Sequence, residues 1–435
     1  MFVIPAAAVL IILAASSPVF QNSDEQIEPM IVDVSGISNG AELQQALDRQ
    51  ADQGGRVRLS QATSLTCTPL ECVIGDEVSR HALLIPAGID LDLNGSTLLL
   101  DLRVNSHGVR LSSRSGIRNG TIRIVGSENK GSQAIWHAGI GIGAAYDDGG
   151  TPAKPGYFSK VSDWRIENIT IDQPYPAAAI QIMSEACHGV IRDVRILDSR
   201  EALLGIGMDW GSVGKMTTAD ATIPHMRELW EQNEIYTTHP HDILIQDIDI
   251  GHLTRNIDGN DAGIRCSACY NIQVRNVHVA SAASALAVFG GDCGFEFAPN
   301  ELRPLAHTGY VVDRLVIDKA FRYGIVLNGI ADNVYRATQT HGYRTLIDPT
   351  QPGLNGVRIA NSQFNGSGTA ASQGMFITAV SHAEVSDVTV KNFAIGVRIK
   401  DWVDGLRFKN ADLSQNLQPQ SIFSSTREPK DLTFK

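Results

Sequence analysis

One pattern recurs along most of this chain and limits the folds that it can adopt. Apolar residues alternate with other residues over a short segment, an Asn or Asp interrupts the alternation, and the alternation then resumes. A period of two is typical of a β-strand with one buried face. The interrupting side chain can hydrogen-bond locally and lets the backbone turn a corner. The copies are centred on Asn168, Asp193, Asp247, Asn276, Asn361, Asp387 and Asn410.

A second pattern alternates with the first, in which a small residue is followed by apolar residues one and three positions later. Its copies open at Gly108, Gly139, Ala179, Gly205, Gly263, Ala285, Gly324, Gly374 and Gly396. Short strands that repeat irregularly, with loops inserted between them and no helical pattern, predict a parallel β-solenoid. Its coils would stack at about 4.8 Å, the ordinary distance between strands. An antiparallel sandwich would need hairpin turns every 8–12 residues or so, which the sequence lacks.

These repeats, together with the segment that leads into them, resemble the pectin-lyase-like superfamily of right-handed parallel β-helices. The leading segment is ISNGAELQQALDRQADQGGRVRLS, followed by LLIPAGIDLDLNGSTLLL. The resemblance covers about residues 31–415 and implies an all-β, single-stranded, right-handed parallel β-helix. The superfamily contains pectate and alginate lyases, polygalacturonase-type hydrolases, uronan C5-epimerases and phage tailspikes. It therefore implies a carbohydrate ligand but no particular reaction.

The two ends of the chain are expected to differ from the solenoid between them. Residues 1–20 are predicted to be a signal peptide, because an apolar run ends in small residues and is short for a membrane span. No Lys or Arg precedes that run, and a buried first strand is the alternative. We expect a secreted or periplasmic protein with no stable membrane span. Residues 38–52 are predicted to form a helix that caps the solenoid, and residues 416–435 a tail that packs on the last coil.

Composition narrows the choice of partner. The net charge of −11 is dispersed, with no block of Lys or Arg, which argues against nucleic acid. The six cysteines are compatible with an oxidising compartment. Cys266-x-x-Cys269 lacks the second pair that a zinc site needs, so no metal site is expected there. Asp147 and Asp148 can bind calcium or form a solvated turn. Nothing decides the oligomeric state.

Three long insertions, residues 211–242, 290–309 and 329–354, leave the solenoid on the same side. Each follows a strand of the second pattern and precedes the next corner. Loops that lengthen on one side of consecutive coils build the walls of a groove, where binding and catalysis usually occur. The expected floor is the outward face of the strands of the second pattern. Its polar members are Gln181, Asp209, Arg265, Ser267, Asn328, Thr378, Arg398 and Lys400.

The floor contains one pair of opposite charge on neighbouring coils. Asp209 and Arg265 would lie about one strand apart, and together they can bind and orient a uronate, because Arg holds a carboxylate with two hydrogen bonds. A solvated strand face is the alternative for each position. The other side chains that we expect to bind substrate are His239, Asp242, Asp258, Asp292, Trp210, Asn328 and Lys400.

The segment Tyr236-Thr-Thr-His239-Pro-His241-Asp242 carries the most specific local signal. It resembles the Tyr-x-x-Asp-Pro-His-Asp/Glu segment of mannuronan C5-epimerases, with His239 in place of the Asp. The resemblance implies that Tyr236 and His241 are an acid/base pair. Abstraction of a proton α to a carboxylate also needs a cation on that carboxylate, and Arg265 is the candidate. The alternative is that His-Pro-His only ends a loop.

Two other functions remain open. A glycoside hydrolase would need two carboxylates about 5 Å apart for retention or about 6.5–9.5 Å apart for inversion. The candidates are Asp209, Asp258, Asp261, Asp292 and Glu296. A non-catalytic carbohydrate-binding solenoid needs none of these groups. The leading hypothesis is an exported enzyme that acts on a uronate-containing polysaccharide by proton abstraction, as a lyase or a C5-epimerase.

Overall fold

The computed structural model describes most of the chain after the first 29 residues. It covers residues 30–435 except 69, 75–76, 102–106, 126–137, 144–159, 173–177, 184, 201, 210–222, 255–256, 258–260, 291–293, 299–300, 331–343, 346–351 and 425–426. The predicted signal peptide lies outside the described residues, as do Asp147 and Asp148. Within the described part, no helix combines the length and apolar character that crossing a membrane requires.

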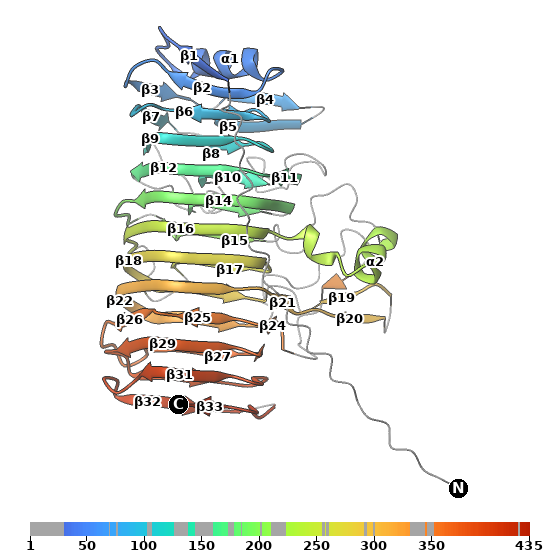
Figure 1. Cartoon of the computed structure of the whole chain (residues 1–435), viewed down its shortest axis with the longest axis vertical. Coiled ribbons are helices and arrows are strands. Elements are labelled where there is room, and N and C mark those ends of the chain that lie inside the picture. The colour runs from blue at the N-terminus through green and yellow to red at the C-terminus, as the bar shows by residue number, and fades with distance from the viewer. Residues whose placement is uncertain are drawn as a thin grey trace.

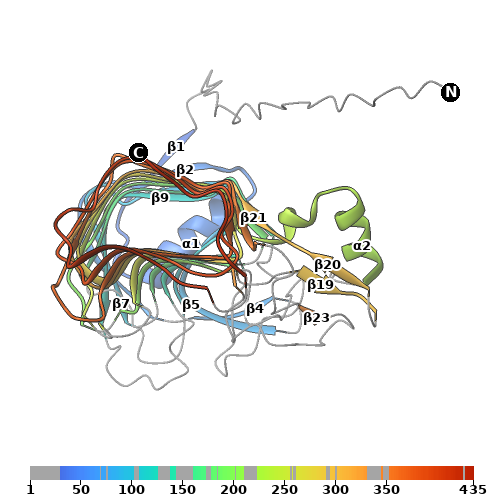
Figure 2. The same cartoon turned by 90° about the horizontal axis from the view of Figure 1, so that it is seen from below.

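The described strands stack in register into a long solenoid with three rows of parallel strands, called rows A, B and C (Figures 1 and 2). Rows A and B come before and after the Asn/Asp corner, and row C contains the second sequence pattern. Eight long strands take part in row A, and most of them continue past the corner into row B: β9 (Gly116–Val125), β12 (Arg165–Asp172), β14 (Glu185–Ile196), β16 (His241–His252), β18 (Tyr270–Phe289), β22 (Val311–Asn328), β29 (Glu384–Lys391) and β31 (Arg407–Asp412).

Shorter strands complete the three rows. Row A also holds β1 (Ile31–Val34), β2 (Gly55–Leu59), β6 (Ile89–Asp92), β25 (Arg358–Ala360) and β33 (Thr433–Phe434), and row B holds β3 (Ser64–Cys67), β7 (Thr97–Asp101) and β26 (Gln363–Gly366). Row C consists of the ends of β18 and β22 together with β5 (Glu77–Ile85), β8 (His107–Leu111), β10 (Ala138–Gly143), β13 (Ala178–Met183), β15 (Leu204–Asp209), β17 (Ala262–Ser267), β27 (Gln373–Thr378), β30 (Ile395–Ile399) and β32 (Gln418–Ile422).

The remaining elements lie beside the rows. Strand β4 (Leu70–Ile74) pairs antiparallel with β5, and β11 (Lys160–Ser162) pairs with the start of β14. Small sheets are formed by β19 (Gly294–Glu296), β20 (Leu302–Pro304) and β23 (Arg344–Thr345), and by β21 (His307–Thr308), β24 (Leu354–Asn355) and β28 (Val380–Ser381). The helices are α1 (Gly40–Gln50), α2 (Ile223–Glu231) and the 3-10 helix η3 (Ile235–Thr238).

The predicted corners are confirmed at all seven Asn and Asp residues. Each has a positive φ, for example 56° at Asp247 and 51° at Asn276, a conformation that Asn and Asp adopt more readily than other residues with a side chain. The corners are also linked from coil to coil. Nδ2 of Asn276 donates to Oδ1 of Asp247 at 2.6 Å, and Asn410 donates likewise to Asp387 at 3.0 Å. The corner residue thus turns the chain and joins neighbouring coils.

The predicted register of row C is confirmed as well. The residue after each small residue aligns with its counterpart in the next coil and is buried: Val109, Ile140, Ile180, Ile206, Ile264, Leu286, Ile325, Met375 and Val397. The small residue is needed because the coils approach closely there. A Cβ on Gly205 would lie 2.5 Å from the carbonyl oxygen of Gly263.

Both ends of the solenoid are covered or extended by the chain itself. Helix α1 lies across the first coil, with Leu43 and Leu47 fully buried and Asn39 as its N-cap (Figure 2), as predicted. At the other end, β32 pairs with β30 and β33 pairs with β31, so these two strands extend the solenoid.

Candidate functional site

The candidate site lies where two of the long insertions meet the start of row A. Helix α2 and η3 pack against residues of the next insertion through the buried side chains of Met226, Ile235 and Phe297. Arg227 Nε also donates to Oε1 of Glu301 at 3.1 Å. This lateral module, residues 223–240 and 294–305, projects from one side of the solenoid (Figures 1 and 2). It holds η3, and therefore Tyr236, beside the first residues of β16.

Tyr236 and His241, which the sequence segment singles out, lie in contact. Their ring centroids are 5.3 Å apart with the rings perpendicular. His241 opens β16 and is buried, whereas Tyr236 is partly exposed. An acid and a base that contact each other at the edge of a solvent-accessible loop can exchange protons with a bound ligand.

The protonation pattern of His241 follows from its backbone contact. Its Nδ1 lies 2.7 Å from the carbonyl oxygen of His239, and a carbonyl oxygen can only accept, so Nδ1 carries a proton. Burial lowers the pKa of His241, and this outweighs the hydrogen bond to His239 and the charge of Asp242, which raise it. The ring is therefore neutral near pH 7, with its lone pair on Nε2.

Asp242 lies at a second corner of the coil, distinct from the Asn/Asp corner between rows A and B. Its φ is 54°, and the residues in register with it on the adjacent coils, His188 and Asn271, have φ of 51° and 52°. Nδ2 of Asn271 donates to Oδ1 of Asp242 at 3.0 Å. The other oxygen, Oδ2, lies 3.8 Å from Nε2 of His241 and 3.7 Å from Nε2 of His188. The carboxylate is therefore held between two imidazoles.

His239 is a packing residue in this structure. Its side chain is fully buried, where Nδ1 contacts the Thr238 hydroxyl at 2.9 Å and the ring packs 5.3 Å from Tyr270 and 5.4 Å from His307. A buried ring does not contact a polysaccharide. His239 is thus part of an aromatic cluster with Tyr270 and His307.

Arg265 and Asp209 lie on neighbouring strands of row C, as expected, but they are not in register with each other. Arg265 aligns with Gly207, and Asp209 aligns with Ser267. The guanidinium of Arg265 lies 5.0 Å from the ring of Phe289 on the next coil. His241 belongs to row A and aligns with Tyr270, so Arg265 and the Tyr236–His241 pair occupy different rows, joined by the short turn before Tyr270.

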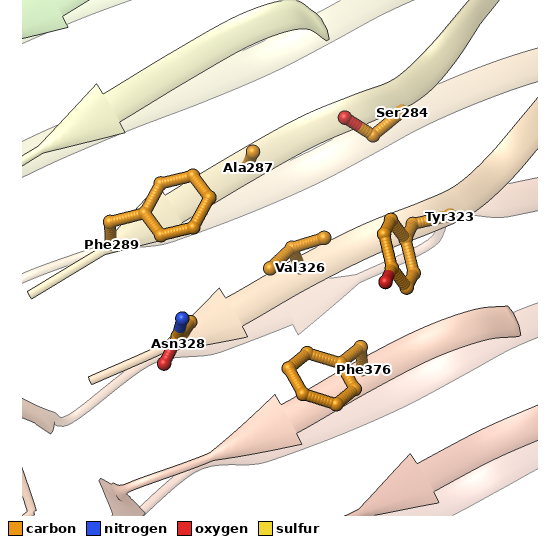
Figure 3. Close-up of a pocket in the computed structure, with 7 residues that line it drawn as sticks. All are labelled: Ser284, Ala287, Phe289, Tyr323, Val326, Asn328 and Phe376. Atoms are coloured by element: carbon orange, nitrogen blue, oxygen red, sulfur yellow. The ribbon is translucent and has the colours of Figure 1, made fainter. Parts of the chain in front are cut away.

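The floor of the groove is less polar than predicted. Ser267 and Thr378 are buried, whereas Gln181, Asp209 and Arg265 are partly exposed. On the coils after Arg265, row C carries an aromatic platform made of Phe289, Tyr323 and Phe376, together with Ala287 and Val326. Figure 3 shows these side chains on three neighbouring strands of row C, around a cavity of about 160 Å³ that Ser284 and Asn328 also line.

Cations flank this platform. Arg322 lies over the ring of Tyr323 at 5.0 Å, as Arg265 does over Phe289. The Tyr323 and Phe376 rings are 5.8 Å apart. Aromatic rings offer apolar surface to a pyranose ring, and the guanidinium groups over two of these rings can pair with a carboxylate. The predicted floor contained only polar outward residues, so these aromatic residues were not predicted, although they occupy the same strands.

The other predicted residues are spread over several places. Asp261 is fully buried, so its side chain presents no surface to a glycan. Lys400 is partly exposed and directly follows β30. It lies several coils further along the solenoid than His241. Trp210, Asp258 and Asp292 lie outside the described residues.

One group of residues was missed entirely by the sequence analysis. Cys187 and His188 lie on β14, the coil next to His241, and one donor atom from each of the three residues falls within 4.8 Å of the others. Cys187 aligns with His241 in the strand register. The corner pattern around Asp193 predicts β14 itself, and extending that register backwards would have placed Cys187 beside His241.

Comparison with known proteins supports the fold. No protein-family model matches the chain, and no curated protein matches its sequence. Solved structures match over most of it. The Streptococcus pneumoniae surface protein and adhesin PfbA is 12% identical with a TM-score of 0.45, over 93% of this chain and 100% of that one.

Two further solved structures match the chain. The A-module of an Azotobacter vinelandii mannuronan C-5 epimerase is 14% identical with a TM-score of 0.44, over 92% of each chain. The tailspike protein of E. coli bacteriophage HK620, solved with a pentasaccharide, is 9% identical with a TM-score of 0.52, over 90% of this chain and 62% of that one. At these identities the likeness concerns the fold, and the fold is the right-handed parallel β-helix.

Proposed function

Because the chain is a right-handed parallel β-helix protein, we propose that it modifies a uronate-containing polysaccharide by abstracting the proton α to the carboxylate. The observation that carries this proposal is the contact between Tyr236 and His241, whose rings lie 5.3 Å apart. The two residues come from different elements, η3 and β16, and the short turn between these elements brings their rings together. The protein is expected to meet this substrate outside the cytoplasm.

In the proposed reaction, Nε2 of His241 accepts the proton from C5 of a uronate. The electron pair of the broken C–H bond moves onto the carboxylate group, where a cation stabilises it. The Tyr236 hydroxyl then has two possible roles. It gives a proton to the opposite face of C5, which completes an epimerisation, or to the departing glycosidic oxygen, which completes a β-elimination.

Arg265 is the cation that we propose stabilises this carboxylate. It lies on row C beside the aromatic platform, and the chain runs from it through a short turn to Tyr270, which pairs with His241. A polysaccharide that crosses the platform would present the carboxylate of the reacting uronate to Arg265 while C5 of the same sugar faces the Tyr236–His241 pair. A long substrate is therefore expected to react faster than a disaccharide.

The experiment that tests this function follows two products at once. Purified protein is incubated in deuterated water with alginate, pectate, a glycosaminoglycan and a neutral glycan. A lyase produces unsaturated uronate, seen by its ultraviolet absorbance, and an epimerase incorporates deuterium at C5 without chain cleavage. New reducing ends without either signal would contradict the proposal and would indicate a glycoside hydrolase.

A second function is favoured by the aromatic platform alone. Phe289, Tyr323 and Phe376 with the two flanking arginines would bind an anionic glycan even if no reaction followed. Retention of the protein on an alginate or pectate column, with no product of any kind, would establish a carbohydrate-binding solenoid in place of an enzyme.

A further inference from the structure

Three side chains on two adjacent coils form a compact set of donor atoms for a soft metal ion. The Cys187 thiol, one nitrogen of His188 and one nitrogen of His241 lie within 4.8 Å of one another. A tetrahedral zinc ion with bonds of about 2.0–2.3 Å draws its donors to roughly 3.5 Å from each other. Side-chain rotations that close each separation by about 1 Å would therefore complete the site.

The backbone explains how neighbouring residues face one ligand. In a regular strand, Cys187 and His188 would point to opposite faces. His188 instead adopts a φ of 51°, and the corner that results turns its ring toward the same region, 4.0 Å from Sγ of Cys187 and with a ring centroid 5.9 Å from that of His241. The conformation is one that a His adopts less readily than a Gly or Asn.

The groups around the three donors have the arrangement that metal sites use. The Nδ1–H of His241 is held by the His239 carbonyl at 2.7 Å, which leaves Nε2 to coordinate. The carboxylate of Asp242 lies 3.7 and 3.8 Å from Nε2 of His188 and His241. Asp163 Oδ1 lies 3.5 Å from Nδ1 of His188. A carboxylate that faces the second nitrogen of a ligating imidazole orients the ring and increases its basicity, as Asp163 would for His188 bound through Nε2, whereas Asp242 lies on the coordinating side of His241.

Local charge also favours a cation. The carboxylates of Asp163 and Asp242 lie 3.5 and 3.7 Å from the two ring nitrogens of His188. These two acidic residues create a negative potential beside the donor atoms, which favours a divalent cation. On binding, the thiol would release its proton to solvent and coordinate as the thiolate.

We propose that Cys187, His188 and His241 bind one divalent transition-metal ion of the zinc type, through the thiolate and one imidazole nitrogen of each histidine. Sulfur and nitrogen donors select such an ion over calcium or magnesium, which prefer oxygen. Three protein donors leave a fourth position for water, because His188 lies on the exposed side of the cluster.

The ion would regulate the proposed reaction, and this consequence rests on the proposed function. A metal bound at Nε2 of His241 occupies the lone pair that would accept the C5 proton. The loaded protein is therefore expected to be inactive, and removal of the metal to restore activity. Metal binding itself requires no glycan and is measured without one.

The experiment uses Co²⁺ as a spectroscopic probe on the full chain, with a phosphine reductant and no glycan. The wild-type protein is expected to bind one Co²⁺ with a near-ultraviolet charge-transfer band of a cobalt–thiolate bond, and Zn²⁺ to displace it. Cys187→Ser is expected to abolish that band. His188→Asn is expected to weaken Co²⁺ binding at least about tenfold, or about 1.4 kcal/mol.

Asn is the appropriate replacement at position 188 because Asn271 holds the equivalent corner two coils away with a φ of 52°. The matched control is His382→Asn, which changes another corner histidine, with φ of 51°, that contacts Asn355 at 2.9 Å. It should bind Co²⁺ like the wild type. Absence of the band in the wild type, or its persistence in Cys187→Ser, would overturn the metal site and leave the enzymatic proposal standing.

Discussion

His241 donates its Nδ1–H to the carbonyl oxygen of His239, two residues earlier, over 2.7 Å. This bond fixes the tautomer and aims Nε2 away from the backbone of its own loop. The structure therefore makes a specific prediction about Nε2. In metal-free protein, His241→Gln is expected to lower kcat on the uronate polymer by about 10²–10⁴-fold, because a general base contributes an acceleration of this size.

His278→Gln is the control for that variant. His278 also contacts carboxylates, Asp249 at 2.8 Å and Asp318 at 2.9 Å, but it lies on the far part of β18, past the Asn276 corner. It should keep full activity. If His241→Gln retained wild-type kcat with an unchanged thermal unfolding midpoint, His241 would not be the base.

Tyr236→Phe tests the acid. The variant keeps the ring that packs 5.3 Å from His241 and removes only the hydroxyl. We expect kcat to fall by about 10²-fold or more while KM changes little, because the packing surface survives. Measurement of kcat and KM separately distinguishes this from a binding role. A rise in KM at constant kcat would contradict proton transfer by Tyr236.

Phe376→Ala tests the aromatic platform. The Phe376 ring lies 5.8 Å from Tyr323 and lines the 160 Å³ cavity. Loss of one stacking surface is expected to weaken glycan binding by about 1 kcal/mol, or roughly fivefold in Kd. Phe423→Ala, on an exposed residue after β32, is the control. Equal affinities of both variants, measured by calorimetry, would remove the platform from the binding surface.

The corner at Asn276 makes a prediction about stability. Asn276→Ala loses the 2.6 Å hydrogen bond to Asp247 and must also hold a φ of 51° without a favourable side chain. We expect the unfolding free energy to fall by about 2 kcal/mol, the sum of a hydrogen bond and the left-handed strain.

Asn276→Gly separates these two contributions. Glycine adopts the positive φ without strain, so this variant should lose about half as much as alanine. Both are compared with Arg275→Ala at the neighbouring exposed position. If alanine and glycine were equally destabilising in urea, backbone strain would play no part at this corner.

The stability of the protein should depend on pH through His278. Burial of the ring opposes its charge, but hydrogen bonds to Asp249 and Asp318 outweigh this and raise the pKa of His278. A pKa raised by folding stabilises the protein fully below the unfolded value, near 6.5, and this stabilisation is lost as pH rises through the folded value.

The difference in stability between the wild type and His278→Gln should therefore be greater at pH 5.5 than at pH 8.5, by a few tenths of a kcal/mol for such a partly exposed pair. Thermal midpoints at the two pH values provide the measurement. A difference that grew with pH would refute the assignment of His278 as the group responsible.

The coils were predictable from sequence because two local rules apply at every repeat. Alternation with a period of two determines which side chains enter the core, and a positive φ is tolerated at few residue types, so Asp247 and Asn276 mark the corners directly. A one-residue slip would turn every buried Ile outward. The register of the strands from Val109 to Val397 could therefore be predicted from the sequence alone.

The site was only partly predictable. Tyr236 and His241 are close in sequence, and their contact depends on one short segment. The neighbours of His241 come from other coils, so Cys187 and His188 were found only from the strand register. His239 was predicted to face a substrate, but Tyr270 and His307 enclose it. Packing of a loop depends on distant residues that no local pattern records.

Each coil in this molecule contacts mainly the coils directly before and after it, as the pairing of β14 with β16 and of β16 with β18 illustrates. The scaffold and the insertions are for that reason free to diverge at different rates. A change of loop between β15 and β16 can alter the chemistry at the mouth of the groove while the inward Ile and Val residues stay as they are. Replacement of that loop would thus change the surface that the protein offers to a ligand while the fold stays the same.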